Sequence, residues 1–335
     1  SSLTTENMYQ PKATRAEVYA QIIKDFDEAI AALPDKPYSD SQMSGYFTPG
    51  AMKAFKARLM LAEAYDDNGN ADASKMGAIV TLLEGIQGYE LADRMRDNFI
   101  SAQQLASPEI MFSVRYLAPN TTHSMDLYYG AWTTCGVTRD LVNAFECTDG
   151  LKWGESPLTA TVDESLLATG ALSDANKAER EKLFSGTNGV HIRDRRLYET
   201  VCHSGVALFP DEGYEENGPI TITNQMQTGF GMMKLLQPTT EMPSYSTISD
   251  ADVVILRYAE VLMMIAEAEN EANGPTQKVY DAVNKVRVRS GQPELPAGLT
   301  KDQMRERIRN EWRVEFVFEG HRYFQLKRWK LMDKL

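Results

Sequence analysis

The chain has 335 residues, 43% of them hydrophobic and 24% charged, which is typical of a folded globular protein and excludes a disordered or fibrous chain. At this length we expect either one large elaborated domain or two closely packed lobes. The formal net charge of −12 argues against a nucleic-acid partner, because affinity for phosphates depends on clustered Lys and Arg side chains.

The N-terminal part of the chain is predicted to form three helices. The first opens at Thr14, where Glu17 completes a capping box, and ends at Leu33 because a proline follows. Two further helices are expected over residues 51–65 and 71–86, where alanines alternate with large side chains. Small residues allow helices to approach closely, so this part resembles tetratricopeptide-type repeats.

The middle of the chain has little helical periodicity and is rich in Gly, Pro, Thr and Asn, with short strand-like runs such as 109–116. A long irregular region within a helical protein is usually functional or flexible. We therefore divide the chain into a helical part at 1–91, an irregular ligand-binding region at 92–250 and a C-terminal helical part at 251–335.

Helical periodicity returns at Asp252, stops at Gly274 and then resumes as a second helix of an antiparallel pair. Thr300 and Gln303 form another capping box, which opens a last predicted helix that closes at Gly320 before an aromatic, basic tail. The predicted fold is mostly α, with tetratricopeptide-like helix pairs at both ends and a loop-rich insertion that contains short strands.

Several ordered blocks along the chain resemble the SusD/RagB family. The strong blocks lie near the C-terminus, at 256–262 (LRYAEVL), 266–268 (AEA), 283–289 (VNKVRVR), 311–316 (EWRVEF), 318–324 (FEGHRYF) and 326–329 (LKRW). Weaker blocks in the same order lie at 143–145, 148–150, 193–197 and 229–234. Three positions depart from the family pattern, namely Arg195, Trp312 and Gln325. The resemblance extends over essentially the whole chain.

This resemblance implies a non-enzymatic surface lipoprotein of Bacteroidota that binds glycans at the extracellular face of the outer membrane. It also implies a partner, a SusC-like TonB-dependent transporter to which the glycan is delivered. Family members begin with a lipoprotein signal, a lipidated cysteine and further helices, and none of these is visible before Thr14. We therefore expect that the N-terminal portion of the family, with its lipid anchor, is missing from this chain.

No motif for catalysis or metal binding occurs in the sequence. HExxH, P-loop and GxSxG patterns are absent, the four histidines lack metal-ligand spacing, and the three cysteines form no CxxC pair. We predict no catalytic residue, no metal and no cofactor. A glycan-degrading enzyme stays an alternative, since the sequence does not show whether two of its 47 acidic residues lie about 5 to 10 Å apart across a cleft.

Three glutamates recur every four residues near the C-terminus and share one helix face, at Glu311, Glu315 and Glu319. A general acid/base pair is one reading of this pattern, but arginines are abundant nearby. We predict that these carboxylates form a solvated or half-buried ion network with Arg305, Arg309, Arg313 and Arg322.

Aromatic side chains are the candidates for ligand binding, because sugar rings present apolar faces that stack on Trp and Tyr. Tyr128, Tyr129 and Trp132 form a cluster in the irregular region, and Asn120 and Asp126 are the candidate polar partners. The alternative for each ring is that it only holds a loop onto the helices. A peptide-capturing, RagB-like function is the competing interpretation of the cluster.

The remaining aromatic residues fall into two groups. The second-rank ligand candidates, at least half of which we expect to be structural, are Trp153, Phe209, Tyr214, Phe230 and Tyr245. Trp312 and Trp329 instead follow the terminal helical pattern, so we predict that both belong to the core.

Overall fold

In the computed structural model of the chain the described residues are 4, 8, 12–34, 45–131, 136–167, 173–186, 191–203, 228–237 and 244–334. The predicted Trp132, Phe209 and Tyr214 lie outside them. Among the described residues no helix is both long and apolar enough to cross a membrane.

The N-terminal part forms the three predicted helices, α1 (Arg15–Ala32), α2 (Pro49–Glu63) and α3 (Ala73–Glu84). The capping box of Thr14 and Glu17 is present at the start of α1. Side-chain oxygens of Thr48 and Asp72 accept backbone N–H groups at the starts of α2 and α3. The local capping signals therefore set these helix starts.

The C-terminal part contains α9 (Tyr258–Asn273), α10 (Gln277–Arg289), α11 (Lys301–Glu315) and α12 (His321–Arg328), followed by the short η5 (Met332–Lys334). The capping box at the start of α11 is confirmed. The predicted last helix is wrong in its extent, because α11 ends before Gly320 and the expected tail forms α12. Gly320 has a positive φ of 81°, a conformation in which glycine is favoured, and it separates the two helices.

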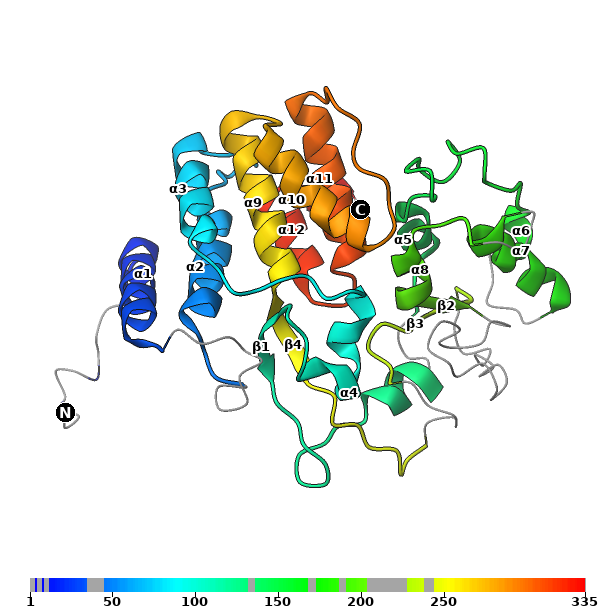
Figure 1. The fold of residues 1–335 in the computed structure, drawn as a ribbon, viewed down its shortest axis with the longest axis horizontal. Coiled ribbons are helices and arrows are strands. Elements are labelled where there is room, and N and C mark those ends of the chain that lie inside the picture. The colour runs from blue at the N-terminus through cyan, green and yellow to red at the C-terminus, as the bar shows by residue number, and fades with distance from the viewer. Residues whose placement is uncertain are drawn as a thin grey trace.

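The two ends of the chain form one helical layer, in which α3 packs against α9 and α9 packs against both α10 and α11 (Figure 1). The predicted close helix contacts are confirmed at Ala54 and Ala57 of α2, which are completely buried. Trp312 and Trp329 are buried in the same core, as predicted. We call the elements α1–α3 and α9–α12 the scaffold.

Two small antiparallel sheets lie below and beside the scaffold in Figure 1. In the first, β1 (Ile110–Val114) pairs with β4 (Val253–Arg257). In the second, β2 (Val201–His203) pairs with β3 (Phe230–Met232). The strand expected within 109–116 is confirmed, but the helix expected from Asp252 is wrong, since the run VVILR forms β4. Its β-branched residues favour a strand once β1 supplies a pairing partner.

The region between the scaffold halves, 92–250, contains more regular structure than predicted. The helical elements among its described residues are η1 (Met95–Phe99), α4 (Ser101–Gln104), η2 (Leu127–Ala131), α5 (Arg139–Ala144), α6 (Glu164–Leu167), α7 (Asp174–Ser185) and α8 (Arg195–Thr200). A second apolar core forms here around Phe145, Leu183 and Leu197. Val314 of α11 also belongs to this core, so the middle region packs directly on the scaffold.

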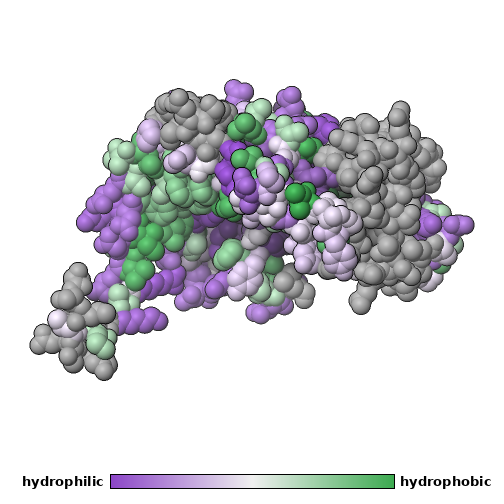
Figure 2. All heavy atoms as spheres, turned by 90° about the horizontal axis from the view of Figure 1, so that it is seen from below, coloured by the Kyte–Doolittle hydropathy of each residue, from purple (hydrophilic) through white to green (hydrophobic). Residues whose placement is uncertain are grey.

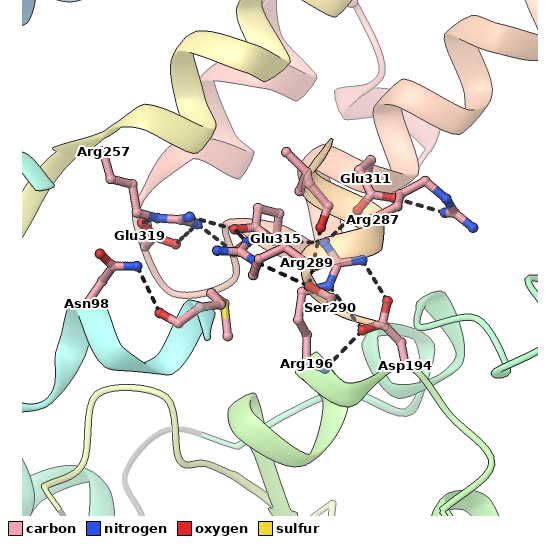
Figure 3. A network of polar contacts seen from close by, with 12 residues as sticks. Asn98, Asp194, Arg196, Arg257, Arg287, Arg289, Ser290, Glu311, Glu315 and Glu319 are labelled. Carbon is pink, nitrogen blue, oxygen red and sulfur yellow. Dashed lines mark hydrogen bonds and ion pairs between the residues drawn. The ribbon is translucent and has the colours of Figure 1, made fainter. Parts of the chain in front are cut away.

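A buried network of ion pairs joins the scaffold to the middle region (Figure 3). Arg257 donates to Glu109 at 2.7 Å, to Glu315 at 2.5 Å and to Glu319 at 2.8 Å. Arg289 contacts Glu109 and Glu315 as well. Because Glu109 precedes β1 while Arg257, Arg289 and Glu315 lie on β4, α10 and α11, the network connects segments that are far apart in the sequence.

The same network continues toward α8. Arg196 binds Asp194 at 2.6 Å, Glu311 at 2.5 Å and Glu315 at 2.8 Å, and the side chains of all four residues are at most 2% exposed. Arg287 binds Glu311 at 3.0 Å from the other side. The Glu311 carboxylate is therefore held between the guanidinium groups of Arg196 and Arg287.

The predicted ion network of Glu311, Glu315 and Glu319 is confirmed, but the predicted arginine partners are wrong. The actual partners lie on other elements, at Arg196, Arg257, Arg287 and Arg289 with Lys234. The arginines named from local spacing pair elsewhere, for example Arg305 with Glu271 and Arg313 with Asp140. The network is also almost fully buried rather than half-buried.

Burial and charge act in opposite directions on the glutamates of this network. Burial alone would raise the pKa of the Glu315 carboxyl, but Arg289, Arg257 and Arg196 outweigh it and hold that pKa well below its usual range. Burial would also raise the pKa of the Glu319 carboxyl, but Arg257 and Lys234 outweigh this effect and lower that pKa to about 2. The carboxylates of Glu315 and Glu319 are therefore ionised at neutral pH and unsuited to general acid/base catalysis.

Candidate functional site

The predicted ligand-binding cluster lies on a segment, residues 117–131, that leaves β1 and returns toward the second sheet. The segment begins with a tight loop, in which the N–H of Leu117 donates to Thr121 O at 2.8 Å and the reverse bond is 2.9 Å. Asn120 lies at the exposed tip of this loop. Its amide is therefore presented to solvent, as a polar ligand contact requires.

The loop is followed by a contact that brings a distant part of the chain beside the segment. The backbones of His123 and Ser249 exchange two hydrogen bonds of 2.9 Å each. His123 Nε2 also lies 2.9 Å from Ala251 O, and its ring packs edge-on against Tyr116. Residues 244–249, which include the candidate Tyr245, are consequently attached to the candidate segment.

Asp126 lies at the start of η2 and is 4% exposed. Its Oδ1 accepts the backbone N–H of Gln237 at 2.5 Å, so the carboxylate connects η2 to the segment that follows β3. Burial raises the pKa of the Asp126 carboxyl, although the Gln237 N–H and neighbouring polar groups partly oppose this shift. The geometry gives Asp126 a positioning role and does not present its carboxylate at the surface.

Gln237 extends this anchor on its other side. Its side-chain Oε1 accepts the backbone N–H of Ser101 at 2.8 Å, and its Nε2 donates to Phe99 O at 2.8 Å. One residue thus connects η1, α4 and η2. Sequence reasoning missed Gln237, His123 and Ser249 as positioning residues, because each acts across more than 100 residues of chain and has no local motif.

The aromatic candidates on and beside η2 are exposed to different degrees. Tyr128 is 49% exposed, while the neighbouring Tyr129 is partly buried. Tyr245 is 83% exposed on a turn in which the Ser244 N–H donates to Thr247 Oγ1 at 2.8 Å. Tyr128 and Tyr245 therefore lie on two anchored loops whose backbones are joined through His123 and Ser249.

Trp153 and Phe230 do not belong to this surface. The guanidinium of Arg193 lies 4.6 Å from the centre of the Trp153 indole, and the ring packs against the second core. Phe230 is 1% exposed within the same core. Both rings therefore hold the middle region together, which is the structural alternative that the sequence left open for each candidate.

A small cavity of about 150 Å³ lies next to the anchored segment. His123 and Met125 line it together with Leu235, Ala251 and Phe318. Most of this lining is apolar, and a cavity of this size is too small for an oligosaccharide, since ligand pockets commonly enclose about 300 to 1,000 Å³. This cavity is therefore not suited to a glycan, and the exposed Tyr128 and Tyr245 stay the candidates for ligand contact.

The polar and aromatic groups near this surface indicate how it can contact a ligand. Among the described residues no group of His, Cys, Asp and Glu side chains is arranged to hold a metal ion. Asp126 is buried against Gln237, and the nearby Asp252 is paired with Arg115 at 2.8 Å. Exposed rings and the Asn120 amide remain as groups that can contact a ligand by stacking and hydrogen bonding.

Comparison with known proteins shows what the chain resembles. The model of the SusD family matches residues 96–335. The SusD-like proteins P2 and P25 of Formosa agariphila are 36% identical over 94 residues and 37% identical over 82 residues. These alignments cover 26% and 24% of this chain, and 19% and 15% of the relatives.

Solved structures extend the similarity to nearly the whole chain. A SusD-like protein from Bacteroides fragilis superposes with a TM-score of 0.71 at 25% identity, and it matches 98% of this chain. A SusD-like carbohydrate-binding protein from the same species has a TM-score of 0.69 at 22% identity over 98% of this chain. The chain spans only 63% and 61% of the lengths of these two proteins.

Proposed function

The chain belongs to the SusD family, and on that premise we propose that it captures glycans at the cell surface without cleaving them. The observation that carries the proposal is the exposed Tyr128 on η2, whose backbone is anchored through Asp126 and Gln237. The similarity to a carbohydrate-binding protein of the same fold supports the same class of ligand.

Stacking on tyrosine suits a glycan for a physical reason. The C–H faces of a sugar ring are apolar and pack on an aromatic ring, while the hydroxyls need hydrogen-bonding groups at its edge. Tyr128 and Tyr245 offer such rings, and Asn120 offers an exposed amide. A shallow, open surface of this kind gives modest affinity for one sugar unit, and binding along a polymer compensates through multivalency.

The state of the nearby carboxylates supports binding without turnover. Hydrolysis of a glycosidic bond needs two carboxyl groups held about 5 to 10 Å apart on either side of the scissile bond. Beside the candidate tyrosines Asp126 is buried and Asp252 is ion-paired. Glu311, Glu315 and Glu319 lie in the buried network, where arginine side chains and Lys234 hold them. This arrangement supports binding over the alternative of a glycan-degrading enzyme.

The test is a panel of polysaccharides and peptides offered to the purified protein. We expect retardation in native gels that contain at least one polysaccharide, with no released oligosaccharide after prolonged incubation. Trp132→Ala and Tyr128→Ala should each weaken this retardation while both variants stay folded. Release of sugar products would contradict the proposal, and retention of peptides alone would favour the RagB-like, peptide-capturing function.

We extend the proposal to delivery of the glycan to a SusC-like TonB-dependent transporter, with the protein held at the outer membrane by a lipid anchor. Family membership supports this step. Affinity purification from the native membrane, followed by identification of the associated proteins, tests it. Co-purification of a TonB-dependent transporter is the expected result, and a soluble protein without any such partner would contradict it.

A further inference from the structure

The anchor of the tyrosine segment contains a buried titratable group whose ionisation the proposed glycan capture does not use. Asp126 at the start of η2 is 4% exposed, and its Oδ1 accepts the Gln237 N–H at 2.5 Å. Its other oxygen, Oδ2, is also buried and has no hydrogen-bond partner among the described residues. An ionised carboxylate in this position is costly, because it has lost most of its hydration and gained few partners.

The neutral form of Asp126 suits this position better than the charged form. Burial raises the pKa of its carboxyl above the ordinary value of 3.8, and the Gln237 N–H, the Ser249 hydroxyl and His123 oppose this shift only in part. In the described part of the chain no lysine or arginine is among the groups that oppose it most. The charged carboxylate is therefore better accommodated where water can reach it.

Water lies close to this anchor. Tyr128, two residues beyond Asp126, is 49% exposed. Residues 117–131 lie on the lower side of the molecule in Figure 1, and Figure 2, which views that side, shows polar and apolar residues mixed over the middle of the face. A small outward movement of η2 would hydrate the carboxylate at the expense of its bond to Gln237, whose side chain would keep its own bonds to Ser101 and Phe99.

We propose that Asp126 makes the attachment of η2, and with it the strength of ligand binding at Tyr128, sensitive to pH. In acid the neutral carboxyl keeps η2 bound at Gln237, so that Tyr128 is held in place before a ligand arrives. As the pH rises the carboxylate becomes ionised and the attachment loosens. A ligand must then order the segment, which reduces the affinity. The effect on affinity rests on the proposed glycan capture, whereas the change in attachment is a property of the protein alone.

The other charged groups around the anchor have partners of their own. Asp250 accepts the Ser101 hydroxyl at 2.7 Å, and this bond holds the pKa of its carboxyl below the ordinary value. Asp252 is paired with Arg115 at 2.8 Å. The buried Arg96 of η1 donates to backbone carbonyls of the segment that leads to Gln237. Asp126 differs from these groups because it combines burial with an oxygen that lacks a partner.

His123 lies on the same segment and would act in the opposite direction. Its Nδ1 accepts the Met125 N–H at 3.3 Å, and its Nε2 lies 2.9 Å from Ala251 O, an arrangement that suits a neutral imidazole. Protonation of Nδ1 in acid would remove the bond to Met125 and loosen the segment. Glu319 lines the same small cavity as His123 but is held in the buried network. The signs of the two effects therefore distinguish Asp126 from His123.

The first test needs no ligand and compares the melting temperatures of the wild type and Asp126→Asn at pH 4 and pH 8. Asparagine keeps an oxygen that can accept the Gln237 N–H but cannot ionise. Because the pKa of Asp126 is raised in the folded protein, its contribution to stability is complete below the unfolded value and is lost as the pH rises through the folded value. We expect the wild type, relative to the variant, to melt about 2 °C lower at pH 8 than at pH 4. A difference that stays constant with pH would overturn the proposal.

The second test measures Kd for a polysaccharide that the wild type retains, at pH 5 and pH 8. We expect the wild-type Kd to be about three-fold higher at pH 8, and the Kd of Asp126→Asn to be the same at both pH values. Asp250→Asn is the matched control, because it removes a neighbouring carboxylate that has its own donor and should keep the three-fold change. His123→Gln should keep or enlarge that change. A pH dependence that persists in Asp126→Asn, or that Asp250→Asn abolishes, would contradict the assignment to Asp126.

The two tests keep this proposal apart from glycan capture itself. If no polysaccharide is retained at any pH, glycan capture is contradicted, and the melting temperatures decide whether Asp126 controls the attachment of η2. If a polysaccharide is retained with the same Kd at both pH values, glycan capture stands and the pH sensitivity of binding is contradicted.

Discussion

The scaffold and the middle region satisfy their buried backbone in different ways. In the scaffold, helices such as α2 and α9 bond their own carbonyl groups and bury apolar side chains between them. In the middle region, buried arginine side chains donate some of the hydrogen bonds that the backbone carbonyl groups need. Arg193 donates to the carbonyl oxygens of Leu183, Val142 and Phe145, within 2.6 Å in each case. Buried carbonyls need such partners wherever no helix or sheet supplies them.

Arg96 repeats this arrangement close to the candidate site. Its guanidinium, which is completely buried, donates to the carbonyl oxygens of Met233, Lys234 and Leu236. The bonded segment leads directly to Gln237, which anchors η2. Irregular backbone can therefore hold a ligand surface in place, provided that long cationic side chains replace the missing regular hydrogen bonds.

The largest expected effect tests the network that joins the two regions. Glu315→Gln removes the charge that balances Arg196, Arg257 and Arg289, and it leaves these cations buried without their shared partner. We expect the free energy of unfolding, measured in urea, to fall by about 3 to 5 kcal/mol. Glu306→Gln on the same helix is the control, because Glu306 is 71% exposed and should change stability by less than about 0.5 kcal/mol.

Similar losses in both variants would show that the network stabilises the protein no more than a surface ion pair does. The two regions would then be joined mainly by apolar contacts, such as those of Val314 with the second core.

Protonation of Glu319 in acid should weaken the network that joins the two regions. The ordinary pKa of its carboxyl is 4.5, and Arg257 and Lys234 lower it to about 2 against the effect of burial. Because the folded-state pKa lies below the unfolded one, the stabilisation is complete above the unfolded pKa and is lost as the pH falls toward the folded value. This loss amounts to about 3 kcal/mol. Thermal unfolding followed from neutral pH into acid should show it.

Glu319→Gln provides the comparison for this pH dependence. The variant is less stable at neutral pH, but its stability should fall less steeply in acid because the titrating group is gone. Identical slopes for the two proteins would assign the acid sensitivity to other carboxylates.

A smaller effect is expected where an arginine supports irregular backbone. Arg193→Met keeps much of the apolar length but leaves the carbonyls of Leu183, Val142 and Phe145 without their donor. We expect a loss of about 2 to 3 kcal/mol in urea unfolding. Arg195→Met, two residues along the chain, removes a side chain that is 41% exposed and should have little effect. Equal stability of both variants would show that these carbonyls find other donors.

Local signals in the sequence were sufficient to predict most of the scaffold helices. The capping boxes at Thr14 and Thr300 mark helix starts that depend only on residues a few positions away. The strand β4 could not be recognised in this way, because it exists through pairing with β1, more than 100 residues earlier. The spacing of Glu311, Glu315 and Glu319 predicted an ion network, yet the partners on α8, β4 and α10 depend on tertiary structure.

The candidate site was predictable only as a set of residue types. The sequence named Tyr128 and Tyr245, but their exposure depends on how the loops are anchored. It also grouped Asp126 with ligand contacts, whereas its bond to Gln237 buries it. Only the tertiary contact between Arg193 and the Trp153 ring distinguishes Trp153 from the exposed aromatic residues. Whether the tyrosines contact a glycan stays a prediction.

The most direct test asks whether the middle region binds the ligand through Tyr128 while the scaffold does not. It measures the dissociation constant of Tyr128→Ala for a polysaccharide that the wild type retains, together with the melting temperature of the variant. We predict a rise of about ten-fold or more in Kd. The melting temperature should stay within about 2 °C, and the scaffold control Tyr323→Ala should change neither quantity. An unchanged Kd, or a fall of more than about 5 °C in melting temperature, would contradict the account, since Tyr128 would then be a structural residue.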